Sequence, residues 1–176
     1  MRIKKTLIGE TEIKEKIAEA GRKITEEYRG KPLILVGILK GSFVFLADLC
    51  RAIDIPCEIE FIGVKSYGSG TVSSGELEWT LELNRDISGY HVIIAEDIID
   101  SGITLQLTAK KLAEKNPLSL KIVTLLDKPD RRQVDFKADT TLFTIPDAFV
   151  VGYGLDCAEK YRNLPYIAEL EENESK

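Results

Sequence analysis

Apolar and polar residues follow two different periods along the chain, and these periods predict its helices and strands. Between residues 11 and 28 apolar side chains recur every three to four positions, which predicts an amphipathic helix. The uninterrupted apolar runs at 33–39 and 92–95 suit strands that are buried on both faces of a parallel sheet, and 120–126 is predicted as a further strand. Strict alternation over 76–83 instead predicts a half-buried antiparallel strand. The other expected elements are helices at 43–53 and 105–114 and strands at 57–64, 141–145, 149–151 and 166–170.

Strands that alternate with helices through the middle of the chain predict an α/β fold with a central, mostly parallel sheet flanked by helices. In such sheets the ligand lies outside the carboxyl ends of the strands. The turn at Lys40-Gly41 and the loop at 96–104 both leave from that edge. With 176 residues, the chain has room for one domain, 1–176, but not for two of ordinary size.

Composition and charge exclude several classes of protein. The net charge of −5 and the pI of about 5.1 argue against a broad basic surface for nucleic acid, although Lys128, Arg131 and Arg132 could form a local basic patch. The three cysteines have no paired spacing, which is typical of reduced thiols. No segment resembles a leader or a membrane span. We therefore expect a cytoplasmic protein with no nucleic-acid partner and no membrane partner.

The largest group of residues that could bind a ligand or react lies just after the apolar run at 92–95. Two carboxylates, Glu96 and Asp97, stand where the strand is expected to end, and the following loop carries an acid, a glycine and two hydroxyls: Asp100, Ser101, Gly102 and Thr104. A helix N-terminus suits a phosphate, whereas carboxylates would repel one unless they faced ribose hydroxyls or a metal ion. A sugar phosphate meets both demands. The simpler alternative is a capped helix with a turn glycine, but three carboxylates beside a buried strand are costly without a ligand or partner.

The segment at 66–75 consists almost entirely of serine, glycine and threonine. Such residues bury little surface and lose much conformational entropy on ordering, so the segment is expected to be flexible. Two interpretations stay open from composition alone. It is either a loose hairpin tip or a lid over a site that must exclude water.

Six segments, in chain order, resemble the type I phosphoribosyltransferases, and in particular the bacterial members that act on 6-oxopurines. The segment 92–105 resembles the family's phosphoribosyl-pyrophosphate signature. The other five are Leu39-Lys40-Gly41-Ser42 (pyrophosphate loop), Lys65-Ser66-Tyr67-Gly68 (mobile loop), 126–129 and 149–156 (purine-reading elements) and 161–165 (C-terminal motif). The likeness runs from about residue 11 to residue 170.

The resemblance implies the type I phosphoribosyltransferase fold, with a lid hairpin at about 65–83 and a small purine-reading hood at about 149–170. It implies transfer of the phosphoribosyl group from phosphoribosyl pyrophosphate to N9 of hypoxanthine or guanine, with xanthine a further candidate. The products would be IMP or GMP and pyrophosphate, and the cofactor Mg²⁺. Small-molecule substrates and a homodimer or homotetramer are implied too. The preferred purine is left open.

The resemblance also implies roles for particular residues. Asp100 would be the catalytic acid or base at N7 of the purine, and Lys128 would donate to O6 and so reject adenine. Phosphoribosyl pyrophosphate would be bound by Lys40, Gly41, Ser66, Tyr67, Glu96, Asp97, Ile98, Asp100, Ser101, Gly102, Ile103, Thr104 and Arg162. The purine would be bound by Lys128, Phe149, Val150 and Asp156. Mg²⁺ would be held by Glu96, Asp97 and Asp156.

The family also suggests a cis peptide bond between Leu39 and Lys40. The chain departs from the family's usual pattern at two positions. Ile103 stands where some relatives carry lysine, and Cys157 follows Asp156 where tyrosine is more usual.

Two other classes compete with the enzyme. A regulator on the same fold would sense phosphoribosyl pyrophosphate and bind nucleic acid without catalysis, but the acidic pI and the presence of Asp100, Lys128 and Arg162 argue against it. A phospho-accepting receiver domain also has an acid pair at a strand end. Its pair follows the first strand, however, whereas Glu96-Asp97 lies in the middle of the chain.

Overall fold

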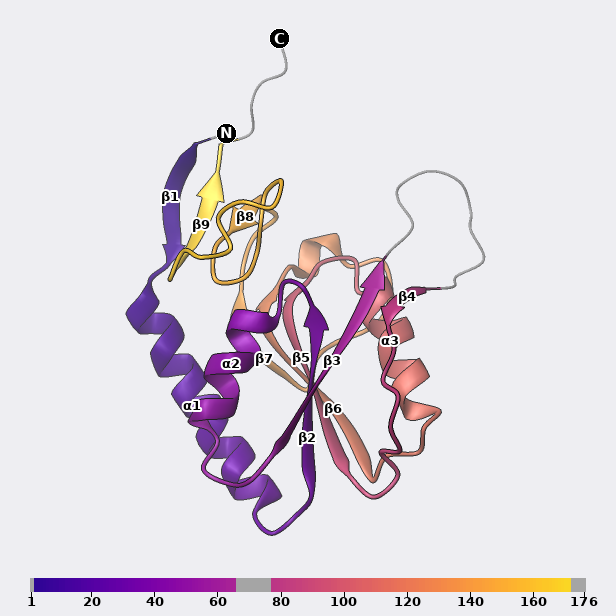
Figure 1. Cartoon of the computed structure of the whole chain (residues 1–176). Helices are drawn as coiled ribbons and strands as arrows, with labels where there is room; N and C mark the ends of the chain where they lie inside the picture. The colour runs from indigo at the N-terminus through magenta and orange to yellow at the C-terminus, as the bar shows by residue number, and fades with distance from the viewer. Residues whose placement is uncertain (1, 66–76, 172–176) are drawn as a thin grey trace.

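The computed structural model describes residues 2–65 and 77–171 (Figure 1). Its elements, in chain order, are β1 (Ile3–Ile8), α1 (Glu10–Tyr28), β2 (Leu33–Leu39), α2 (Phe43–Ala52), β3 (Glu58–Lys65), β4 (Glu78–Leu81), β5 (His91–Ile99), α3 (Ile103–Ala113), β6 (Ser119–Asp127), the 3₁₀ turn η1 (Pro129–Arg131), β7 (Thr140–Thr144), β8 (Val150–Val151) and β9 (Ile167–Leu170). The expected α/β class and the mostly parallel sheet are confirmed.

The main sheet has the strand order β4-β3-β2-β5-β6-β7. Every neighbouring pair is parallel except β3 and β4, which are antiparallel as the alternation over 76–83 predicted. Strand β2 lies at the centre, where Leu35 is in register with Ile59 on one side and Ile93 on the other. Its residues from Leu33 to Ile38 are all buried, which explains the uninterrupted apolar run.

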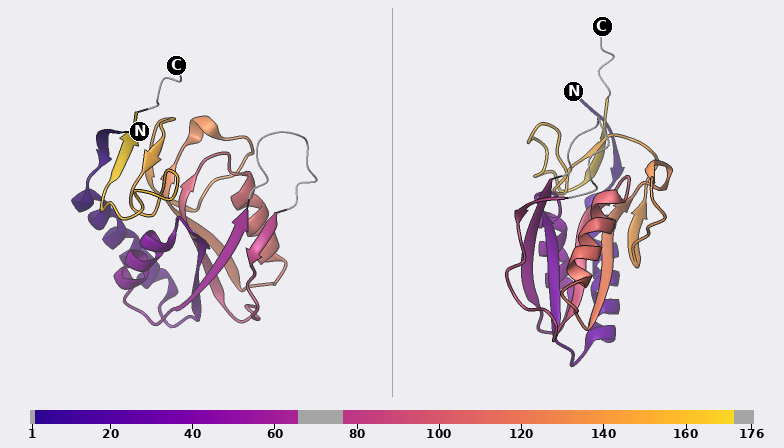
Figure 2. Two further views of the ribbon diagram at one scale, coloured as in Figure 1. Left: turned by 45° about the horizontal axis from the view of Figure 1, so that its top comes forward. Right: turned by 90° about the vertical axis from the view of Figure 1, so that its right-hand side faces the viewer.

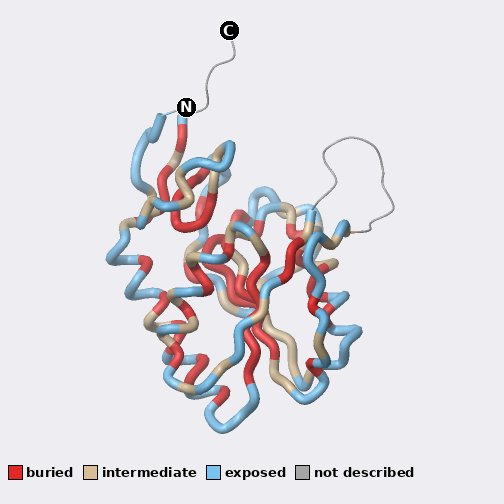
Figure 3. The backbone as a smooth tube through the Cα atoms, in the orientation of Figure 1, coloured by how far each residue is buried: buried red, intermediate tan, exposed pale blue. Residues whose placement is uncertain are grey.

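Helices cover both faces of this sheet and enclose two apolar cores (Figure 2). On one face α1 and α2 pack on side chains such as Leu35 and Ala95. On the other face α3 packs on neighbours of opposite parity, such as Val36 and Ile94. The buried residues therefore lie along the strands and on the inner sides of the helices, as Figure 3 shows. Because the sheet is packed on both faces, its strands are held in place, and so are the carboxyl ends at which the turn after β2 and the loop after β5 begin.

A second, smaller sheet stands beyond the carboxyl ends of the main strands (Figure 1). It has the order β1-β9-β8, and both of its strand pairs are antiparallel. Strands β8 and β9 belong to the segment predicted as the hood. Strand β1 was not predicted, because most of Ile3–Ile8 is exposed and carries two lysines.

Two other predicted elements differ from the observed ones. Strand β5 does not end before the acids but continues through Glu96 and Asp97 to Ile99, because β6 pairs with it as far as Asp127. Strand β4 covers only Glu78–Leu81, and Leu81 is 43% exposed despite its place on the apolar face. The core of the predicted lid, 66–76, lies outside the described residues. Within residues 2–65 and 77–171, no helix combines the length and apolarity needed to cross a membrane.

Candidate active site

An acid pair lies at the carboxyl end of β5. Asp97 is 9% exposed, and its Oδ1 accepts the N–H of Ile98 at 2.9 Å. Glu96 Oε2 is buried and has no hydrogen-bond partner. Burial raises the pKa of both carboxyls, and for Glu96 the adjacent Asp97 raises the pKa further. A buried acid pair with an orphan oxygen fits a site that receives hydroxyl groups or a hard cation.

The turn after β2 lies directly on this acid pair. The peptide bond between Leu39 and Lys40 is cis, as the resemblance suggested. A Cβ built on Gly41 would lie 2.6 Å from Cγ of Asp97 and closer still to Oδ2. No side chain larger than hydrogen fits here. The Lys40-Gly41 turn and the acid pair, 56 residues apart from Gly41 to Asp97 in the sequence, therefore form one surface.

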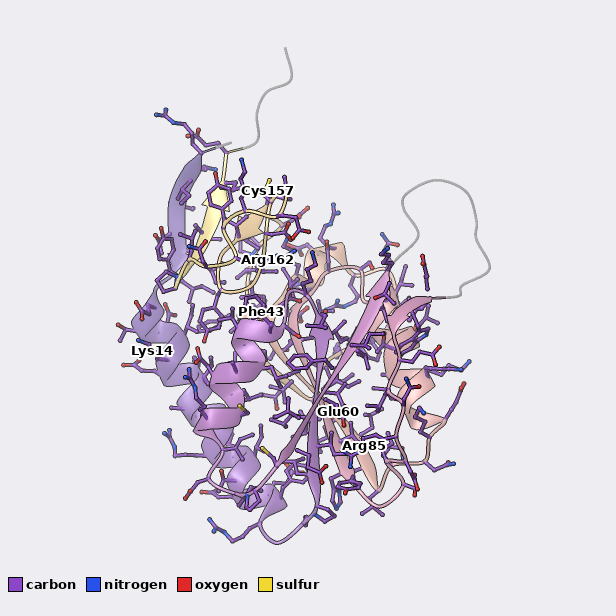
Figure 4. The ribbon with its side chains drawn as sticks, in the orientation of Figure 1. Lys14, Phe43, Glu60, Arg85, Cys157 and Arg162 are labelled. Atoms are coloured by element: carbon purple, nitrogen blue, oxygen red, sulfur yellow. The ribbon has the colours of Figure 1, made fainter. Side chains whose placement is uncertain are left out.

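The hood contributes a loop that closes over the same turn. Gly154 has φ +102, and a Cβ there would collide with the carbonyl oxygen of Gly41. Arg162 Nη1 donates to the Gly154 carbonyl at 2.8 Å, and Arg162 Nη2 pairs with Asp156 at 2.8 Å. The positive charge of Arg162 acts to lower the pKa of Asp97, against the larger effect of burial. Figure 4 shows Arg162 in this loop, facing the N-terminus of α2 at Phe43.

Residues 100–104, which we call the phosphate loop, comprise the turn after β5 and the first two residues of α3. Gly102 has φ +83 and precedes the first residue of the helix. The hydroxyl of Ser101 accepts the N–H of Ile103 at 3.3 Å. The first turn of α3 carries no acidic residue. The positive end of the helix dipole is therefore free to face an anion.

The base-reading candidates lie beside this loop. Arg131 Nε donates to Asp100 Oδ1 at 3.2 Å, and the Lys128 N–H donates to the carbonyl of Ile99 at 2.9 Å. Lys128 is only 7% exposed, and within the part of the chain described its ammonium makes no hydrogen bond or ion pair. The basic patch suggested for Lys128, Arg131 and Arg132 is wrong. Lys128 is buried, and the two arginines pair with Asp100 and Asp127.

Phe149 and Val150 enter the hood and differ in burial. Phe149 is 44% exposed, whereas Val150 is buried in β8 opposite Glu169. Asp147, two residues earlier, pairs with Arg131 at 3.7 Å. The ion pair places this segment near η1 and leaves an aromatic ring open to the solvent.

Some predicted residues are not brought into this arrangement. Ser66 and Tyr67 lie outside the described residues. Asp156 pairs with Arg162 and also accepts the N–H of Glu159 at 2.8 Å. Among residues 2–65 and 77–171, no three acidic, histidine or cysteine side chains gather closely enough to hold a metal ion by themselves. Substrate oxygens would have to complete the coordination of a cation at the acid pair.

Two contacts at the site were not predicted. Glu159 pairs with Lys40 at 3.1 Å, which joins the hood to the turn after β2. Arg132 donates to the Asp100 carbonyl at 2.8 Å. Neither contact leaves a signal in the sequence, because both depend on how distant loops meet.

Comparison with known proteins places this geometry in a family. Residues 8–158 match the family model described as the phosphoribosyl transferase domain. The chain is 50% identical over 166 residues to a hypoxanthine phosphoribosyltransferase of Salmonella typhimurium, covering 93% of each chain. It is 50% identical over 168 residues to a hypoxanthine-guanine phosphoribosyltransferase of Bacillus subtilis, covering 96% of this chain and 93% of the relative.

A solved structure agrees with these relatives. A crystal structure of a hypoxanthine phosphoribosyltransferase from Staphylococcus aureus has a TM-score of 0.92 and 47% identity, covering 96% of this chain and 92% of the other. Sequence and fold thus match over nearly the whole length. The chain therefore belongs to the phosphoribosyl transferase domain family.

Proposed function

We propose that this protein transfers the phosphoribosyl group of phosphoribosyl pyrophosphate to N9 of hypoxanthine or guanine, as an enzyme of purine salvage. The observation that carries the choice of base is Lys128. Lys128 is only 7% exposed, and its ammonium makes no hydrogen bond or ion pair with the described residues, so its three donors are available to a ligand that supplies an acceptor. O6 of a 6-oxopurine is such an acceptor. The amino group of adenine is a donor there and would leave both groups unpaired.

The sugar phosphate is assigned to the phosphate loop and the acid pair. The 5′-phosphate fits the N-terminus of α3, where the amides of residues 101–104 and the hydroxyls of Ser101 and Thr104 are within one turn of each other. The ribose diol fits Glu96 and Asp97, which are buried acceptors at the adjoining strand end. The Lys40-Gly41 turn would then hold the pyrophosphate.

Mg²⁺ fits the acid pair by its chemistry. Carboxylate oxygens are the ligands that Mg²⁺ prefers, and the unpaired Oε2 of Glu96 offers one without breaking a bond. Glu96 and Asp97 would hold the ion together with substrate oxygens, and Asp156 is the candidate on the pyrophosphate side. When bound, the ion supplies positive charge that neutralises the leaving pyrophosphate.

The residues of the chain can perform the remaining steps. As N9 attacks C1′ of the ribose, the C1′–O bond to pyrophosphate breaks, and the base must lose the proton on N7. Asp100 is the acceptor for that proton. Its carboxylate is held by Arg131 and is half exposed, so a base can reach it. Arg162 stabilises the charge on the leaving group.

A Mg²⁺-dependent turnover assay tests the proposal with hypoxanthine, guanine, xanthine, adenine and uracil as acceptors. We expect turnover with hypoxanthine or guanine, little with adenine and none with uracil, and loss of turnover when EDTA removes the metal. Equal turnover with adenine would contradict the role of Lys128. No turnover with any base, together with salt-dependent binding of RNA or DNA, would favour the regulator instead.

The oligomeric state stays a prediction of a homodimer or homotetramer. Phe43, Ile59 and Phe61 are large apolar side chains that are 43%, 39% and 36% exposed, and contact with a second copy would bury such groups. Light scattering coupled to size-exclusion chromatography measures the state directly. A monomer at micromolar concentration would contradict the prediction.

A further inference from the structure

Arg132 makes two contacts that no step of the proposed reaction uses. Its side chain is 14% exposed and lies just after η1. Nη1 donates to the carbonyl of Asp100 at 2.8 Å. Nη2 pairs with the carboxylate of Asp127, the last residue of β6, which is itself only 17% exposed. One guanidinium therefore joins the first residue of the phosphate loop to the strand that leads to Lys128.

The same arginine packs against the glycine of the phosphate loop. A Cβ built on Gly102 would lie 3.0 Å from Cδ and 3.3 Å from Nη1 of Arg132. The next residue continues the contact, because the N–H of Gln133 donates to the carbonyl of Ser101 at 2.9 Å. Two successive carbonyls of the loop, at residues 100 and 101, are therefore held by the segment 132–133.

Holding these carbonyls determines where the adjoining amides point. In a trans peptide the C=O of one residue and the N–H of the next point in opposite directions across the plane. When Arg132 holds the carbonyl of Asp100, the N–H of Ser101 must face away from it. When Gln133 holds the carbonyl of Ser101, the N–H of Gly102 must do the same. The loop then presents amides to an anion while its carbonyl oxygens, which would repel that anion, are turned aside.

We propose that Arg132 is a positioning residue for the phosphate loop: by bridging Asp127 and the Asp100 carbonyl it holds the loop amides in the orientation that binds the 5′-phosphate. This inference rests on the proposed function, because it assumes that phosphoribosyl pyrophosphate is the anion. An arginine is required, because its planar fork reaches two acceptors at once and a lysine ammonium on its flexible stem does not.

The test compares Arg132→Lys and Arg132→Ala with the wild type by two measurements. Calorimetry gives the Kd of phosphoribosyl pyrophosphate in the presence of Mg²⁺, and steady-state kinetics gives kcat and the two KM values. We expect the Kd and KM for phosphoribosyl pyrophosphate to rise about tenfold or more in Arg132→Lys, as loss of a charge-assisted hydrogen bond implies. The KM for hypoxanthine should change less than threefold.

Arg85 supplies a matched control for the loss of a guanidinium. It also bridges two acceptors, Glu58 at 2.6 Å and Glu60 at 3.0 Å. Both acceptors belong to β3 and lie far from the phosphate loop (Figure 4). Arg85→Lys should leave the Kd of phosphoribosyl pyrophosphate within twofold of the wild type. Added guanidinium chloride at millimolar concentration should recover part of the affinity lost in Arg132→Ala and should have no such effect on Arg85→Ala.

The outcomes separate this inference from the proposed function. Absence of wild-type turnover defeats the proposed function, whereas the Kd comparison still judges Arg132. If Arg132→Ala does not fold, Arg132→Lys decides the question alone. The inference is overturned if folded Arg132→Lys binds phosphoribosyl pyrophosphate within twofold of the wild type, or if Arg85→Lys loses affinity to the same extent.

Discussion

Replacing Gly41 with alanine should disable the site through a single methyl group. The added Cβ would lie 2.6 Å from Cγ of Asp97, whereas carbon atoms in ordinary contact are about 3.5–4.0 Å apart. The turn and the carboxylate must therefore separate by about 1 Å. Asp97 cannot simply rotate away, because its Oδ1 is bonded to the N–H of Ile98 and the residue is buried.

The expected effects are larger on catalysis than on stability. Overpacking of this kind costs about 1–3 kcal/mol, which lowers Tm by about 2–10 °C for a chain of this size. A misplacement of about 1 Å at a reacting centre can cost about 100-fold, so kcat/KM for phosphoribosyl pyrophosphate should fall by about that factor. Differential scanning fluorimetry and steady-state kinetics measure the two effects.

Gly89 provides the control for this substitution. A Cβ on Gly89 meets no atom within 4 Å, so Gly89→Ala should change neither Tm nor kcat/KM by a measurable amount. If Gly41→Ala keeps kcat/KM within twofold of the wild type, the close approach of the turn to Asp97 has no functional importance and the reasoning is refuted.

Four further predictions concern separate parts of the molecule. Asp100→Asn should lower kcat about 10²–10⁴-fold while the KM for phosphoribosyl pyrophosphate changes less, and steady-state kinetics showing an unchanged kcat would remove its acid–base role. Lys128→Ala should reduce the preference for hypoxanthine over adenine in competition assays, because it removes the proposed donor to O6; unaltered selectivity would contradict this. The hydroxyl of Tyr153 donates to Asp48, so Tyr153→Phe should lower the free energy of unfolding by about 1.5–3 kcal/mol. Urea titration measures this loss, and an unchanged midpoint would show that the bond contributes nothing. Burial raises the pKa of the Cys57 thiol, so less thiolate forms at a given pH and iodoacetamide at pH 8 should label it more slowly than free cysteine.

Elements whose burial follows a simple pattern were predictable from the sequence. The run at 33–39 matches β2 residue for residue, because all but its last side chain is buried and nothing polar interrupts it. The predicted end of β5 was wrong, because here polar residues interrupt the apolar pattern inside the strand. A pair of acids normally ends a strand, but Glu96 and Asp97 stay in the ladder because β6 continues beside them. Charged residues within a strand can thus hide the position of its end in the sequence.

The candidate site was predictable only as far as its residues share local motifs. The segment 92–105 and the Lys40-Gly41 turn were identified from chemistry and resemblance, and the structure places them in contact through Gly41 and Asp97. The roles of Arg132 and Glu159 were not predicted. Their partners lie in other loops, and an arginine in a loop has the same appearance in a sequence whether it is solvated or buried.

The pairing of β1 with β9 joins residues near the two ends of the described chain, with Ile3 opposite Leu170. During synthesis on the ribosome, β2, β5 and α3 can assemble long before β9 has emerged. A growing polypeptide would thus complete the turns around the acid pair and reach Lys128 before the hood strands β8 and β9 can pair. Nascent chains halted before residue 167 should therefore fold their main sheet and yet bind a nucleobase weakly, because β8 then lacks its partner β9.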